Sequence, residues 1–300
     1  MGASFARTIR IVHPSSLEKN SLLPERIAYL RSSGFTVKFD PVVPDSLWPF
    51  TSASISDRAQ ALTNALLEDD SGIIWCARGG YGASDLLPEL PWAALTKAPQ
   101  KLVIGFSDIS ALHSALWARL GWCGLHAPMP ASELWDVTLP NNDVAQTIAY
   151  CQGSNPSGSV SLTQAWNEAG VQHGHLFGGC LSVLTNLIGT PFFPKDLSRT
   201  ILFWEDVSET PPRILRFYNQ WEQSGAMKGV VALILGQFRQ GGESSVNYGP
   251  AIAAELSRRT KIPIFLSNDF GHCAPNWPLM VGGEALISNM RLQWTKALTL

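Results

Sequence analysis

The chain has 300 residues, 45% apolar and 15% charged, so it is long and apolar enough to bury a large core. This composition excludes disordered and collagen-like proteins, and no run of about 20 apolar residues predicts a membrane span. The 22 Lys and Arg residues against 24 Asp and Glu give a formal net charge of −2, which provides no bulk attraction to nucleic acid or anionic lipid. We therefore expect one large domain or two medium ones with a small-molecule partner, no nucleic acid and no membrane.

Two further features bear on the cellular compartment. The N-terminal segment has no apolar stretch long enough for a signal peptide, so we expect a cytoplasmic location. The cysteines are widely spaced and form no CxxC pair, which argues against a disulfide framework and against a zinc ribbon. We expect reduced thiols at all five of them, Cys76, Cys123, Cys151, Cys180 and Cys273.

Short β-branched runs alternate with segments of helical period through the first half of the chain. This pattern is typical of a parallel sheet covered by helices. The expected strands are 10–12, 35–39, 72–77, 101–105 and 122–126, and the expected helices are 24–31, 56–70 and 109–120. A serine before Asp57 can cap the second helix, whose apolar face packs on the sheet through Ala59, Leu62, Ala65 and Leu66. Ligands of open parallel sheets bind at the carboxyl ends of strands, which directs attention to the turns after 72–77 and 101–105.

The composition shifts to Gly, Ser, Asn and Pro near residue 153. We expect a linker at 153–168 between an N-terminal domain, 1–152, and a C-terminal domain, 169–300. The elements expected beyond it are strands 201–204, 229–235 and 262–266 and helices at 181–188, after Thr210 and at 251–259. Most of the eleven tryptophans fall on apolar segments and are expected in the core.

Three residues are candidates for nucleophilic catalysis, which requires a nucleophile, a base and a group that orients the base. Ser107 lies where strand 101–105 turns sharply into a helix, although Ile109 replaces the last glycine of a GxSxG motif and the local pattern favours a simple N-cap. His272 lies in a loop bracketed by Gly and Pro and is a candidate base, or an exposed or capping histidine. Glu205 ends an apolar strand and is a candidate orienting acid, or a surface acid.

Other motifs point less clearly to chemistry. The glycine-rich turn 78–82 has neither the GxGxxG spacing nor the lysine of a phosphate loop, so its amides fit an oxyanion site better than a nucleotide. The two histidines of His173-Gly174-His175 have no Cys, His or carboxylate at ligand spacing, so no metal is expected. Cys273 is a weaker candidate nucleophile than Ser107, because it adjoins His272 and sequence neighbours usually point apart.

Five motifs resemble, in order, the LD-carboxypeptidase family of serine peptidases, and they span nearly the whole chain. They are Ala77–Gly82, Ile104–His113, Gly178–Ser182, Leu202–Val207 and Phe270–His272. The resemblance implies an α/β fold with two domains. The N-terminal one would be a flavodoxin-like parallel sheet akin to class I glutamine amidotransferases, and the C-terminal one a mixed α/β domain that swivels against it. It also implies a cytoplasmic homodimer that needs no cofactor or metal.

Carried over residue by residue, the resemblance implies Ser107 as nucleophile, His272 as general base and acid, and Glu205 as the acid that orients the imidazole. The amides of Gly80 and Asp108 would form the oxyanion hole. Arg78 is a candidate for binding the substrate carboxylate.

The reaction implied is hydrolysis of the L,D-peptide bond that releases terminal D-alanine from cytoplasmic muropeptide tetrapeptides during peptidoglycan recycling. One alternative is a microcin-immunity-type serine peptidase that cleaves peptidyl or aminoacyl nucleotides, and another is a non-catalytic ligand-binding protein on the same scaffold. Two residues depart from the family pattern, Phe106 in place of a tyrosine and Cys180 in place of an asparagine.

Overall fold

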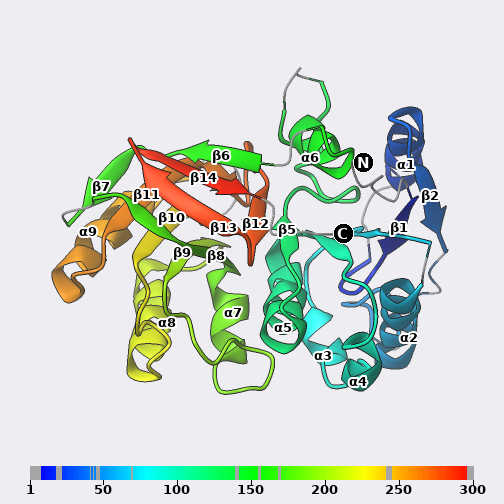
Figure 1. Ribbon diagram of the computed structural model, residues 1–300, viewed down its shortest axis with the longest axis horizontal. Helices are drawn as coiled ribbons and strands as arrows, with labels where there is room; N and C mark the ends of the chain where they lie inside the picture. Colours follow the sequence, from blue (N-terminus) through cyan, green and yellow to red (C-terminus); the bar gives the residue numbers. More distant parts are fainter. Residues whose placement is uncertain are drawn as a thin grey trace.

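The computed structural model describes residues 8–17, 22–40, 42, 44, 48–68, 70–138, 142–154, 157–167, 170–240 and 245–295. Within these ranges the chain forms a six-stranded and an eight-stranded sheet, on the right and the left of Figure 1. One sheet is mostly parallel and helices pack against both, so the predicted mixed α/β fold class is confirmed. None of the helices in the described ranges combines the length and the apolar character needed to cross a bilayer.

The six-stranded sheet contains all five strands expected in the first half. Its strands are β1 (Thr8–Val12), β2 (Thr36–Phe39), β3 (Ile73–Cys76), β4 (Leu102–Gly105), β5 (Gly124–His126) and β12 (Leu279–Val281). The order β12-β5-β4-β3-β1-β2 is parallel except where β12 pairs with β5. The first five strands thus have the flavodoxin-like order 2-1-3-4-5. Every residue of β3, β4 and β5 is buried, which explains their continuous apolar runs.

Helices connect the strands of this half, and several of them pack on the sheet. They are α1 (Leu23–Ser32), α2 (Ile55–Leu67), α3 (Ala83–Leu86), α4 (Trp92–Leu95), α5 (Ser110–Leu120) and α6 (Asp143–Cys151), with a 3₁₀ turn, η1 (Ser107–Ile109), before α5. The expected apolar face of α2 is buried. Its cap is Ser54, whose hydroxyl accepts from the amide of Asp57 at 3.1 Å, so the helix begins slightly earlier than expected.

The eight-stranded sheet is parallel at its centre and antiparallel at its edges. Its strands are β6 (Ser157–Ser161), β7 (Gln164–Trp166), β8 (Gln172–Cys180), β9 (Thr200–Val207), β10 (Ala232–Arg239), β11 (Ile264–Gly271), β13 (Glu284–Ser288) and β14 (Arg291–Thr295). The order is β6-β14-β13-β8-β9-β10-β11-β7, with β8, β9, β10 and β11 parallel. The associated helices are α7 (Leu181–Leu187), α8 (Pro211–Gln223) and α9 (Gly249–Arg259). The parallel arrangement brings the ends of β8, β9 and β11 to one edge of the sheet.

Residues 153–168, expected as a linker, contain the two strands at the outer edges of this sheet, β6 and β7. Edge strands face solvent and carry polar residues, which explains why the composition of this segment resembles that of a linker. Residues 155, 156 and 168 of the predicted linker and residues 1–7 of the N-terminal segment lie outside the described ranges. The domain limits 1–152 and 169–300 stay predictions, and β12, from the second of these ranges, lies in the first sheet.

Candidate active site

Ser107 lies in a strained turn between β4 and α5. Its φ is +63°, a left-handed conformation that costs a non-glycine residue of order 1–3 kcal/mol. Gly105 is needed before the turn, because a Cβ there would lie 2.8 Å from the Ile109 side chain. Gly79 is needed opposite it, because a Cβ there would lie 2.9 Å from Cβ of Ser107 and 3.1 Å from its Oγ. The predicted sharp strand-to-helix turn is therefore present, and the serine hydroxyl packs against the glycine-rich turn.

The glycine-rich turn is tied to the first loop of the chain. Gly80 has a φ of +109°, and a Cβ there would lie 2.4 Å from Oγ of Ser16. The Ser16 hydroxyl accepts from the amide of Tyr81 at 3.2 Å. The buried Asp108 carboxylate accepts from the Ser15 hydroxyl at 2.6 Å and from the amide of Ala83 at 2.7 Å. These bonds hold Gly80 and Asp108, the predicted oxyanion-hole residues, on two turns that touch at Ser107.

Glu205 and His272 form a buried ion pair although they are far apart in sequence. Glu205 is fully buried near the end of β9, and His272 follows β11 directly. His272 Nδ1 and Glu205 Oε2 are 2.5 Å apart. Burial disfavours the imidazolium, but the charge of Glu205 and this hydrogen bond outweigh it and raise the pKa of His272 above its ordinary value. Burial likewise opposes ionisation of Glu205, and the charge and hydrogen bond of His272 outweigh it and lower the carboxyl pKa.

Two contacts join the Ser107 turn to this pair. The Phe106 ring packs edge-on against the His272 imidazole, with ring centroids 5.1 Å apart. The amide of Cys180 donates to the Ser110 hydroxyl at 3.0 Å, and Cys180 is the β8 neighbour of Glu205. Among the described residues no hydrogen bond joins Ser107 to His272. Apo structures often leave such bonds to tighten in the substrate complex, so the arrangement fits a nucleophile, base and acid that assemble fully on binding.

The other predicted residues lie nearby. Arg78 Nη1 donates to the Leu17 carbonyl at 2.9 Å, so the guanidinium lies beside the glycine-rich turn, and its role in binding substrate stays a prediction.

Cys180, in place of an asparagine, has its Sγ 3.5 Å from Oδ1 of Asp206, and burial raises the pKa of the thiol. Burial and the charge of Glu205 raise the pKa of Asp206 to about 6. All five cysteines are free and buried, as expected.

Sequence reasoning missed His126 and Asn276, which are fully buried beside the pair. Burial lowers the pKa of His126 to about 4, although the nearby charge of Glu205 opposes this shift. His126 is the last residue of β5, so a buried strand ends in a polar side chain there. The same signal singled out Glu205 and applies equally to this histidine.

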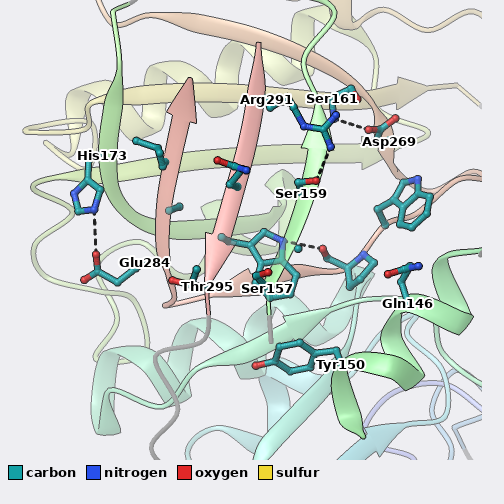
Figure 2. A pocket seen from close by; sticks show the side chains of 17 residues that line it. Gln146, Tyr150, Ser157, Ser159, Ser161, His173, Asp269, Glu284, Arg291 and Thr295 are labelled. Carbon is teal, nitrogen blue, oxygen red and sulfur yellow. Dashed lines mark hydrogen bonds and ion pairs between the residues drawn. The ribbon is translucent and has the colours of Figure 1, made fainter. Parts of the chain in front are cut away.

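A separate cavity of about 960 Å³ is lined by β6, β13, β14 and α6 (Figure 2). His173 and Glu284 meet at its edge, with Nε2 and Oε2 3.3 Å apart. No carboxylate lies at ligand spacing from His173-Gly174-His175 in the sequence, but the pairing of β13 with β8 brings Glu284 beside both histidines. The described residues nevertheless contain no group of three or more His, Cys, Asp or Glu side chains that could hold a metal ion. The residues that line this cavity include neither Ser107 nor the ion pair.

Family profiles cover both halves of the chain. Residues 9–127 match the profile described as LD-carboxypeptidase N-terminal domain, and residues 173–287 match the LD-carboxypeptidase C-terminal domain. The murein tetrapeptide carboxypeptidase of Pseudomonas aeruginosa is 28% identical over 299 residues, covering 95% of this chain and 94% of its own. The microcin C7 self-immunity protein of Escherichia coli is 26% identical over 268 residues, covering 79% and 77%.

A solved structure has the same fold over nearly the whole chain. The crystal structure of muramoyltetrapeptide carboxypeptidase from Oxalobacter formigenes superposes with a TM-score of 0.84 at 30% sequence identity. The superposition covers 97% of this chain and 100% of that one. The two-domain fold and the resemblance found in the sequence are therefore confirmed.

Proposed function

The chain belongs to the LD-carboxypeptidase family, and from this premise we propose that it is a serine carboxypeptidase that uses Ser107, His272 and Glu205 as its catalytic residues. Membership of this family of serine peptidases supports carboxypeptidase activity. The observation that carries the residue assignment is the 2.5 Å contact between His272 and Glu205, with the strained Ser107 turn packed on the same imidazole through Phe106. A nucleophile, a base and an orienting acid are the three groups that acyl transfer through a serine requires.

The geometry gives each group a role. Nδ1 of His272 is held by Glu205, which leaves Nε2 to take the proton of the Ser107 hydroxyl as its oxygen attacks the scissile carbonyl. The buried carboxylate stabilises the imidazolium that forms. The same proton passes to the leaving amine as the C–N bond breaks and leaves an acyl-enzyme. Water then attacks the ester by the reverse route, with His272 again acting as base.

The oxyanion of the tetrahedral intermediate needs fixed donors. We assign the amides of Gly80 and Asp108 to this role, because the turns that carry them meet at Ser107. Loss of one such donor typically costs about 3 kcal/mol of transition-state stabilisation. Glycine is required at position 80, because its φ is +109° and a side chain there would clash with Ser16.

For the substrate, we propose a muropeptide tetrapeptide from which the enzyme removes terminal D-alanine by cleaving an L,D-peptide bond, in peptidoglycan recycling. The names of the Pseudomonas and Oxalobacter relatives support this substrate class. We further propose that the protein works as a cytoplasmic homodimer. The microcin self-immunity relative supports the alternative, cleavage of a peptidyl or aminoacyl nucleotide.

One experiment tests both the residue assignment and the substrate. Purified protein is incubated with a muropeptide tetrapeptide and, separately, with an aminoacyl sulfamoyl nucleoside, and products are read by mass. We expect a tripeptide and free D-alanine from the wild type and none from Ser107→Ala. Ser114→Ala, on the same α5 but bonded to the Phe192 carbonyl away from the turn, is the matched control and should keep its activity. Equal turnover by Ser107→Ala would reject the nucleophile, and cleavage of the nucleoside alone would favour the alternative substrate.

A further inference from the structure

Four buried polar atoms, one on Glu205 and three on its neighbours, have no hydrogen-bond partner. They are Oε1 of Glu205, both ring nitrogens of His126 and Nδ2 of Asn276. All three side chains are completely buried. An unsatisfied buried polar group costs about 1–3 kcal/mol, and such groups are rare in native proteins. Four in one cluster next to a proposed catalytic pair therefore point to a role that the mechanism above does not use.

His126 occupies the wall between the two sheets. It ends β5, paired with Gly105 of β4 on one side and with Leu279 of β12 on the other. Its ring packs edge-on against Phe203, at 5.4 Å between centroids, and against Phe106, at 6.0 Å. Phe106 also contacts His272, so it lies between the two histidines. His126 is therefore placed behind the residues that would contact substrate.

Asn276 is held firmly on the loop that follows His272. Its backbone amide donates to Oδ2 of the buried Asp143 at 2.8 Å, and its side-chain Oδ1 accepts from the backbone amide of Gly271 at 3.3 Å. These bonds fix the carboxamide beside the His126 ring, while its Nδ2 has no hydrogen-bond partner.

The donors and acceptors of the cluster match. Burial holds the pKa of His126 near 4, so at neutral pH the ring has one N–H and one lone pair. Asn276 offers N–H groups and the Glu205 carboxylate offers only acceptors. A single chain, from Asn276 Nδ2 to one ring nitrogen and from the other ring nitrogen to Glu205 Oε1, satisfies all four atoms. No other pairing among them does so.

We propose that His126 is a positioning residue for Glu205, forming the chain Asn276 to His126 to Glu205 in the working enzyme. The proposal rests on the function proposed above. With Oε1 held by His126, the carboxylate keeps Oε2 on His272 Nδ1 while the imidazolium forms. A carboxylate held by one oxygen can rotate away, and errors of about 1 Å cost roughly 100-fold in rate.

Two carboxylates raise the pKa of His272, and only one of them, Glu205, would be held by His126. Asp206 raises the pKa of His272 together with Glu205. Burial and the nearby His126 lower the pKa of His113, another buried histidine, on α5. Loss of the His126 contact leaves Asp206 in place and loosens Glu205. The pKa of His272 should therefore fall in such a variant, because Glu205 contributes the main opposition to burial.

The test uses His126→Phe, which keeps the ring and its aromatic contacts but removes both nitrogens. We expect kcat to fall roughly 10- to 100-fold with little change in KM, and the acid limb of the kcat profile to move to lower pH. Asn276→Ala should move both in the same direction. His126→Gln, which keeps a donor and an acceptor, should remain closer to wild type. His113→Phe is the matched control, and we expect it to leave the acid limb unmoved.

A second readout does not depend on turnover. The pKa of His272, measured by NMR in the inactive Ser107→Ala background, should fall when His126→Phe is added. A folded His126→Phe protein with wild-type kcat and an unmoved His272 pKa would overturn the proposal. If that variant does not fold, an unchanged acid limb in Asn276→Ala overturns it instead. Failure of the proposed function is distinct, because wild type and Ser107→Ala would then behave alike.

Discussion

Replacing Glu205 with Gln tests how much the buried carboxylate contributes to catalysis. Gln keeps the shape of the side chain and removes its charge. In the free enzyme with neutral His272 the change leaves no uncompensated buried charge, so we expect the fold to survive and thermal unfolding near pH 8 to change little. In the transition state His272 carries a positive charge, and Oε2 of Glu205 is its partner at 2.5 Å.

The size of the effect follows from this burial. Glu205 is completely inaccessible and the side chain of His272 is 15% exposed, so water cannot replace the lost partner. Removing one partner of a buried pair costs about 3–5 kcal/mol. Since about 1.4 kcal/mol is a factor of ten in rate, we expect kcat to fall roughly 10²- to 10⁴-fold.

Initial rates of D-alanine release from a muropeptide tetrapeptide, at saturating substrate and across pH, measure this loss. The acid limb should also move to lower pH, because without the Glu205 charge burial lowers the pKa of His272. Glu209→Gln, which removes the charge that pairs with the exposed Arg213 further along the chain, is a suitable control and should leave the rate unchanged. A Glu205→Gln protein with a rate within about threefold of wild type would refute the role assigned to the carboxylate.

Three further predictions follow from the site. Wild-type activity should be present at alkaline pH and lost as pH falls through the raised pKa of His272, so a flat pH–rate profile through and above the ordinary histidine range would contradict its role as base. Gly79→Ala should abolish activity while the protein still folds, because the new Cβ would lie 2.9 Å from Cβ of Ser107; normal turnover would show that the turns can separate freely. The five buried cysteines should resist a thiol reagent such as dithionitrobenzoate until the protein unfolds, because burial raises the pKa of Cys76, Cys123 and Cys180; a fast-reacting thiol in the native protein would contradict the burial of these side chains.

The elements of the first half were predictable because each carries its own signal. Strands such as 101–105 are short apolar runs bounded by turn residues, and α2 repeats its apolar residues at helical spacing. The sharp turn at Ser107 was also predictable, since a buried strand runs directly into a helix there. Its left-handed backbone was not, because the local sequence equally fits a plain N-cap.

The second half was predicted less well because its signals are weaker. The edge strands β6 and β7 are short and polar, and β8 contains three glycines and two histidines that obscure its alternation. The strands β12, β13 and β14 near the C-terminus were missed altogether. β12 pairs with β5, which is distant in sequence, and β13 and β14 pair with each other as a hairpin whose outer edges pair with the distant β8 and β6.

By itself the sequence determined the fold class, the two strand-to-helix turns and, through five ordered motifs, the family and the candidate serine, glutamate and histidine. Periodicity and motif order are properties of neighbouring residues, so they can be read along one dimension. Only the tertiary structure decided which side chains meet: Glu205 with His272, Gly79 with Ser107, and His126 and Asn276 behind them. These contacts depend on the packing of strands β5, β9, β11 and β12 from two sheets, and no local pattern records the register of such packing.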